Sequence, residues 1–205
     1  MKVPEHIAFS YLLAQFGVQQ AYGPAGTALT ILAGCLPDLD GLTVVAGWSF
    51  YRRYHRIVGH GLPVTLLGPA LLAALGSCLL HLGAFLPLWL WLQVALLGHL
   101  LTDFCFYRWP LQLLWPVSTR GWGLGLVAWN DLLPTATLYA AAAMALASPA
   151  VAPMAAAAGL GGLFTYLAWR AWRPRPRSSW SAWLAGNWAR QSAPVWRWLT
   201  GDFIT

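Results

Sequence analysis

Charged side chains are scarce in this sequence. They make up 9% of 205 residues, whereas 59% are hydrophobic and the mean hydropathy is +0.57. An average soluble domain carries about 25% charged residues, so the composition excludes an ordinary soluble domain and predicts an integral membrane protein. The net charge of +6 comes from arginines near the apolar segments. This placement is typical of contact with anionic lipid headgroups, and nucleic acid is not expected as a partner.

Several chemical motifs are also missing. Cys35, Cys78 and Cys105 form no C-x-x-C pair, and we expect them to be small buried hydrophobic residues. No G-x-S-x-G motif occurs, which disfavours a serine hydrolase. Glu5 and His6 lead straight into an apolar run, so a cleaved signal peptide is not expected.

Apolar segments alternate with short polar loops along the chain. The apolar runs predict a short helical hairpin at the N-terminus, then spans, in the order 5–18, 25–36, 61–80, 86–106, from about 122 onward, and 155–172. The predicted fold class is therefore all-α, a polytopic transmembrane helical bundle. Residues 1–177 form the membrane-embedded, hydrolase-like domain, and residues 178–205 form an interfacial amphipathic tail rich in Trp and Arg.

The predicted spans sort the charged residues by membrane side. All twelve Lys and Arg residues fall on one side, which the positive-inside rule makes cytoplasmic. We therefore predict a multi-pass protein of the bacterial inner membrane. The other ionisable residues gather on the same side, with Asp131 two to three turns inside its span. His81 falls on the opposite side, and we expect no chemical role for it.

The most informative motif is Leu-Gly-His-Leu-Leu-Thr-Asp at residues 97–103. It places His99 and Asp103 four residues apart, on one face of an apolar helix. An Asp near the bilayer centre costs about 2.5–3.5 kcal/mol on insertion scales, so this carboxylate needs a partner. A metal ion gripped by both side chains is the leading interpretation, and a His–Asp hydrogen bond that joins helices is the alternative.

Two further motifs carry residues suited to the same site. Asp38 and Asp40 flank Leu39, and in an extended segment both carboxylates would face one ion; Pro-Asp and Asp-Gly are also ordinary turn dipeptides. His55 and His60 bracket Arg-Ile-Val-Gly, whose glycine gives the backbone freedom before the second imidazole. Such nitrogen ligands suit zinc, and the alternative is a basic loop at the lipid headgroups.

Together these residues predict mixed His/Asp ligation of one or two divalent ions, zinc in first place and manganese in second. The candidate ligands are His6, Asp38, Asp40, His55, His60, His99, Asp103 and Asp131. Nearby arginines suited to hold a phosphate, or else to set membrane topology, are Arg52, Arg53, Arg56, Arg108 and Arg120.

In their order along the chain, these motifs resemble the YdjM-like family, LexA-regulated inner-membrane proteins assigned as metal-dependent hydrolases. The resemblance covers roughly residues 1–140. It rests on His6 at the start of the first helix, Leu-Pro-Asp-Leu-Asp, His-Arg-x-x-x-His, Gly-His-Leu-Leu-Thr-Asp and Leu-Leu-Trp-Pro-Val-Ser. The second histidine motif departs from the family pattern His-Arg-Gly-x-Thr-His-Ser, because the hydroxyl residues around His60 are absent.

The resemblance implies a metal-dependent hydrolase. The implied metal ligands are His6, Asp38, Asp40, His55, His60, His99 and Asp103, and Asp131 resembles an acidic site in a later helix of the family.

The expected function is hydrolysis of a lipid-linked ester, with a phosphoester as leading candidate, by metal-activated water at the cytoplasmic membrane face. A site near the interface suits a lipid substrate that arrives laterally. Asp38 or Asp40 would accept the proton, and an arginine such as Arg56 would hold the leaving phosphate. The alternatives are an ion, proton or metal transporter, and a non-catalytic scaffold with a structural polar cluster.

Overall fold

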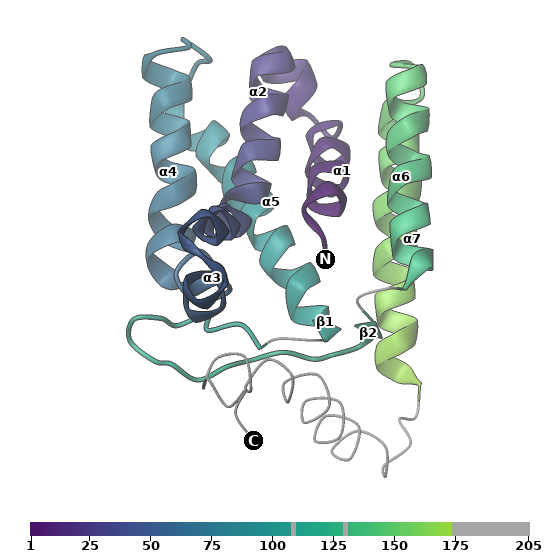
Figure 1. Cartoon of the computed structure of the whole chain (residues 1–205). Coiled ribbons are helices and arrows are strands. Elements are labelled where there is room, and N and C mark those ends of the chain that lie inside the picture. The colour runs from purple at the N-terminus through teal and green to yellow at the C-terminus, as the bar shows by residue number, and fades with distance from the viewer. Residues whose placement is uncertain (108–109, 129–130, 174–205) are drawn as a thin grey trace, which may run out of the picture. The chain divides into compact units, whose positions relative to one another are not determined.

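Apolar helices dominate the structure, a computed structural model (Figure 1). It describes residues 1–107, 110–128 and 131–173, so the predicted tail at 178–205 and Arg108 lie outside the described residues. Residues Met1–Ala171 form one compact unit. The elements are α1 (Val3–Ala14), α2 (Val18–Cys35), the 3-10 helix η1 (Leu36–Ala46), α3 (Trp48–Tyr54), α4 (Leu62–Cys78), α5 (Phe85–Cys105), β1 (Phe106–Tyr107), β2 (Val127–Ala128), α6 (Leu132–Ala147) and α7 (Ala152–Trp172).

The predicted all-α class is confirmed. Within the described residues the only strands are β1 and β2, which have two residues each and pair in parallel. Two stretches are long and apolar enough to cross a membrane, Val18–Ala46 and Phe85–Cys105. Leu62–Cys78 and Leu132–Ala147 are shorter apolar helices. The remaining spans of the predicted bundle stay a prediction.

The N-terminal hairpin differs in its second helix. Residues 19–24, which separate the two predicted helices of the hairpin, belong to α2, which begins at Val18 and kinks at Gly23. Gly23 has φ 63, a left-handed conformation that glycine adopts without a Cβ clash, and Pro24 then opens the next helical stretch. The predicted 25–36 helix is therefore the second part of α2.

Other boundaries also differ from the predictions. The segment with Asp38 and Asp40, considered as extended or as a turn, is the 3-10 helix η1, and α3 follows it before His55. The span predicted from about 122 begins only at Leu132, where Asp131 is the N-cap and accepts a hydrogen bond from the Leu133 N–H at 3.1 Å. Placing Asp131 two to three turns inside a span was wrong, because Asp favours the N-cap over a helix interior.

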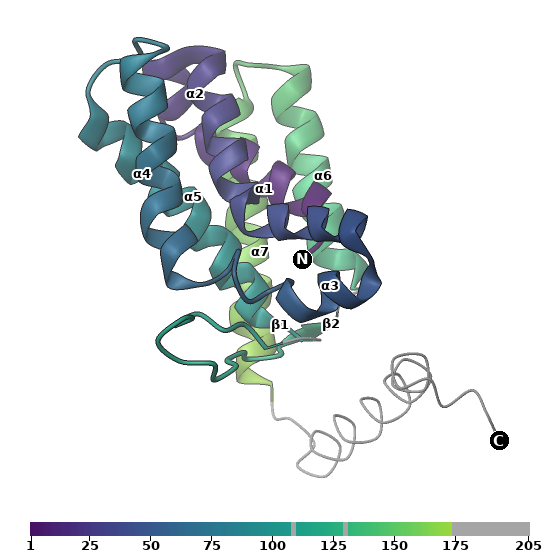
Figure 2. The ribbon, with the colours of Figure 1, turned by 60° about the vertical axis from the view of Figure 1, so that its left-hand side comes forward.

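The unit contains two hydrophobic cores. One joins α1, α6 and α7, with Leu12, Leu138 and Leu163 fully buried. The other joins α2, α4 and α5 through residues such as Leu88 and Leu92. The first turn of α1, η1, α3, the last turn of α5 and β1–β2 lie at the same end of the unit (Figures 1 and 2). This arrangement brings the predicted site residues of distant segments together.

Candidate metal site

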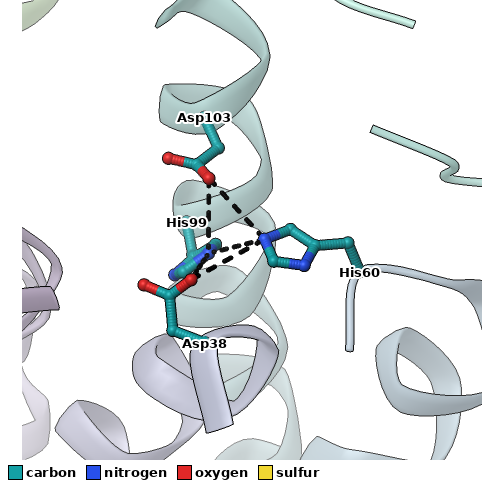
Figure 3. A group of neighbouring side chains, drawn as sticks. All are labelled: Asp38, His60, His99 and Asp103. Carbon is teal, nitrogen blue, oxygen red and sulfur yellow. Dashed lines mark hydrogen bonds and ion pairs between the residues drawn. The ribbon is translucent and has the colours of Figure 1, made fainter. Parts of the chain in front are cut away.

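Four side chains from three chain segments meet at this end of the unit (Figure 3). They are Asp38 of η1, His60 just before α4, and His99 and Asp103 of α5. One potential ligand atom from each lies within 4.8 Å of all the others. The two histidines and Asp103 are buried, and the Asp38 side chain is 9% exposed. Buried carboxylates in apolar surroundings require compensating positive charge, to which Arg56 and the Met1 amino group contribute at Asp103.

His99 has a defined tautomer. Its Nδ1 donates a hydrogen bond to the carbonyl of Gly34 on α2, at 2.7 Å. A carbonyl only accepts, so Nδ1 carries the proton and Nε2 presents a lone pair to the cluster. Metal-binding histidines in proteins are usually oriented in this way. α2 packs closely against α1 at Gly34, where an added Cβ would collide with Ser10 Oγ.

The two histidines of the cluster face each other. His60 Nε2 lies 3.3 Å from His99 Nε2. Because the Nε2 of His99 carries a lone pair, either a proton on His60 Nε2 or a metal ion has to lie between the two nitrogens. Two nitrogen ligands at about 2.05 Å from a tetrahedral zinc ion lie about 3.3 Å apart, so the separation fits. Burial lowers the pKa of His60, but hydrogen bonds and charges from Asp103 and Asp40 outweigh it and raise the pKa above its ordinary value.

The carboxylates complete the group at slightly longer range. Asp38 Oδ1 lies 3.9 Å from His60 Nε2 and 3.8 Å from His99 Nε2. Asp103 Oδ2 lies 3.6 Å and 4.0 Å from the same two atoms. A closed tetrahedral site has ligand separations of about 3.3 Å, so the two carboxylates would have to move inward to complete it. With that movement the residues fit a divalent ion.

α1 adds a third imidazole. The His6 ring is fully buried and stacks on His99, with ring centroids 3.6 Å apart and an interplanar angle of 19°. Its Nε2 lies 3.2 Å from Asp103 Oδ1 and 3.8 Å from Asp38 Oδ2. The amino group of Met1 also contacts Asp103 Oδ1. His6 thus lies beside His99 and faces the second oxygen of each carboxylate.

Arg56 reaches the same site. Its Nη2 lies 2.6 Å from Asp103 Oδ2, and the residue is only 3% exposed. Its φ of 63 lies in the left-handed region, which is uncommon for a residue with a long side chain. The backbone N–H of Arg56 donates to Asp40 Oδ2 at 2.9 Å, so Asp40 stabilises this turn. The structure brings this predicted catalytic residue into the site.

Asp40 and His55 lie behind His60. Asp40 Oδ1 lies 2.6 Å from His55 Nδ1, and Asp40 Oδ2 lies 3.7 Å from His60 Nδ1. Carboxylates placed on the outer nitrogen of a metal-binding histidine orient its ring and raise its basicity. Neither residue belongs to the group of four, so the ligand roles predicted for Asp40 and His55 stay a prediction.

Asp131 makes its described contacts elsewhere. Its side chain caps α6 and accepts a hydrogen bond from Tyr166 of α7. Its ligand role stays a prediction that these contacts do not support. Among the predicted arginines, Arg120 stacks over the Trp122 ring at 4.2 Å, and nothing is described for the side chains of Arg52 and Arg53.

Some contributors to the site were missed from the sequence. The Gly34 carbonyl that fixes His99 is a backbone group and leaves no sequence signal. Glu5 is 2% exposed and accepts a hydrogen bond from Thr135 at 2.6 Å, which ties α1 to α6. Its signal was available, because a lone carboxylate in the first turn of an apolar helix needs a partner. The segment after α5 also supports the site, since the Leu62 N–H donates to the Trp115 carbonyl at 3.0 Å.

The structure is an apolar helical unit with a buried His/Asp cluster at one end. These features define the class of protein: a membrane protein with a candidate metal site. The chain belongs to the YdjM inner membrane protein family, whose model matches residues 1–177. This confirms the resemblance seen in the motifs and the assignment to an inner-membrane family.

The chain is also similar to the uncharacterized protein YfhP of Bacillus subtilis (strain 168), with 28% identity over 111 residues. The match covers 54% of this chain and 34% of that protein, so it spans about a third of the relative's length. No solved structure matches the chain.

Proposed function

We propose that this protein is a membrane-bound, metal-dependent hydrolase that acts on lipid-linked phosphoesters at the cytoplasmic face of the inner membrane. The observation that carries the proposal is the convergence of Asp38, His60, His99 and Asp103, whose ligand atoms lie within 4.8 Å of one another. Two imidazoles and two carboxylates are a donor set suited to zinc or manganese. When bound there, such an ion supplies a Lewis acid that activates water and polarises a phosphoryl oxygen.

The carboxylates are proposed to have different roles in the reaction. Asp38 is the proposed proton acceptor, because its side chain is 9% exposed whereas that of Asp103 is fully buried. A base that exchanges protons with water needs this access. Asp40 already accepts from the Arg56 N–H and pairs with His55, so it is proposed to position neighbouring residues.

Arg56 is the proposed phosphate-binding residue. A guanidinium presents a planar set of N–H donors that match two phosphate oxygens at once. Its Nη2 already lies 2.6 Å from Asp103 Oδ2, within the same buried site. An anionic substrate next to Asp103 would therefore meet this guanidinium.

An exposed apolar surface beside the site supports a lipid substrate. η1 carries Asp38 and Asp40, while Leu42 and Val45 of η1 and Trp48 of α3 are 68%, 88% and 59% exposed. η1 runs across the end of α2 rather than along its axis (Figure 2). Exposed apolar side chains in this amount are typical of contact with a membrane. A lipid headgroup at this surface would lie next to the candidate ligands.

The test is metal content by mass spectrometry on detergent-purified protein, with phosphate release from phosphatidic acid measured beside it. We expect zinc or manganese in the parent and in a His81→Ala control, since His81 is exposed and distant in sequence from the ligands. His99→Ala and Asp103→Ala should lose both the ion and the hydrolysis while remaining helical by circular dichroism. A parent that binds no ion after reconstitution with either metal would overturn the proposal.

A further inference from the structure

The two cluster carboxylates present their oxygens in two directions. Asp38 Oδ1 faces His60 and His99, whereas Asp38 Oδ2 faces His6 Nε2 at 3.8 Å. Asp103 Oδ2 faces the same histidine pair, whereas Asp103 Oδ1 lies 3.2 Å from His6 Nε2. Each carboxylate therefore has one oxygen in the four-residue cluster and one oxygen directed to α1.

We propose a second divalent cation site made by His6 Nε2, Asp38 Oδ2 and Asp103 Oδ1. Asp38 and Asp103 would then bridge two ions, one held by His60 and His99 and the other by His6. This inference rests on the proposed function, because it adds a second ion beside the first. Paired ions that share carboxylates are a known arrangement for phosphoester hydrolysis, in which they hold the attacking and leaving oxygens.

The environment of His6 supports this assignment. The side chain is fully buried, and its Nδ1 has no hydrogen-bond partner among the described residues. The described polar neighbours of the imidazole therefore lie on the Nε2 side. His6 Nε2 is directed at two carboxylate oxygens, and a cation bound there would be held by all three atoms.

The charges of the site indicate when the second ion binds. Counting side chains alone, without the Met1 amino group that the second ion would replace on Asp103 Oδ1, Asp38, Asp40 and Asp103 contribute three negative charges. Arg56 contributes one positive charge, so one divalent ion brings the sum to zero. A second ion raises the sum to two positive charges, which a phosphate dianion balances. The second ion therefore binds more weakly than the first, and phosphate strengthens its binding.

The experiment is a manganese titration of the detergent-purified full chain, followed by electron paramagnetic resonance and calorimetry. The parent and His81→Ala should bind two ions, the second about tenfold more tightly when inorganic phosphate is present. The doubly loaded protein should show the spectrum of a spin-coupled pair. His6→Ala and His6→Gln should bind one ion and lose the coupled signal, and the Gln variant keeps a side chain of similar size.

The outcomes separate this inference from the proposed function. A parent that binds one ion, unchanged in both His6 variants, would overturn the second site and leave the first in place. A folded His6→Gln variant that still binds a spin-coupled pair of ions would also overturn the second site. A parent without any bound ion would remove the second site together with the proposed function.

Discussion

At the residue scale, the partners of each histidine decide which nitrogen faces the cluster. The Gly34 carbonyl takes the Nδ1 proton of His99, and Asp40 lies 3.7 Å from the Nδ1 of His60. Both Nε2 atoms therefore face inward, 3.3 Å apart. The outer nitrogen of His99 is hydrogen-bonded and that of His60 faces a carboxylate, which reduces the cost of ordering the two rings when an ion binds.

Replacing Asp40 tests this positioning. Asp40→Asn removes the charge that His55, His60 and the Arg56 N–H contact, so we expect metal affinity to fall by about 10–100-fold with the helices intact. Competition with a fluorescent zinc chelator measures the change.

Asp131→Asn is the matched control for this variant, because the amide oxygen still caps α6 and the described contacts of Asp131 lie on α6 and α7. An equal loss of affinity in Asp131→Asn would instead make Asp131 a ligand, as the sequence predicts.

Arg56 provides the second residue-scale prediction. Its guanidinium repels a divalent ion while pairing with Asp103. Removing the charge in Arg56→Gln should raise metal affinity about tenfold, the equivalent of about 1.4 kcal/mol, and weaken inhibition by inorganic phosphate. Calorimetry measures the first effect and an inhibition assay the second. Weaker metal binding in Arg56→Gln would mean that the arginine holds Asp103 in place for the ion.

At the element scale, close approaches between segments assemble the site. A Cβ on Gly59 would collide with the Pro37 carbonyl oxygen and lie 2.8 Å from Asp40 Oδ2. The 55–61 segment therefore packs directly against η1 at this glycine. The sequence motif indicated backbone freedom before His60, whereas the structure shows that Gly59 is needed for space.

Gly59→Ala should accordingly separate η1 from the segment that carries His60. We expect at least a tenfold loss of metal affinity, about 1.4 kcal/mol, with little change in helix content. Gly41→Ala in η1 is the control, because no atom lies within 4 Å of its added Cβ. Isothermal calorimetry on both variants checks the expectation, and an unaffected Gly59→Ala would show that the two segments tolerate a wider spacing.

The elements that the sequence predicted well are the continuous apolar helices. The predicted spans at 61–80 and 86–106 match α4 (Leu62–Cys78) and α5 (Phe85–Cys105) within two residues at each end. Hydropathy predicted a wrong span boundary where apolar residues are buried inside the protein and not in a membrane-spanning helix. Leu126 and Val127 belong to the first core and are 6% and 0% exposed. Their hydrophobicity therefore led to a span predicted from about 122, although this segment is not helical.

The sequence predicted which residues belong to the candidate site better than it predicted how they are arranged. His99 and Asp103 share a helix face, and the i,i+4 spacing alone indicates their pairing. The division between His60 in the cluster and His55 behind Asp40 depends on how the 55–61 segment meets η1. That contact is set by tertiary packing at Gly59 and has no local signature in the sequence.

At the scale of the whole molecule, the membrane orientation follows from the two ends of the unit. The site lies at one end with η1 and the 110–122 loop, and the turn between α6 and α7 lies at the other (Figure 1). The positive-inside rule predicts that the site end faces the cytoplasm. Thr119 and Ala150 are exposed residues at the two ends and serve as reporters.

Single-cysteine labelling tests this orientation. In a variant whose three native cysteines are replaced by alanine, Ala150→Cys should react with a membrane-impermeant maleimide added to spheroplasts. Thr119→Cys should react only in inside-out vesicles, because the arginine-rich end stays cytoplasmic. Labelling of both positions from one side would contradict a membrane-crossing path between them. The reverse pattern would place the site in the periplasm, where its lipid substrates would come from the outer leaflet of the inner membrane.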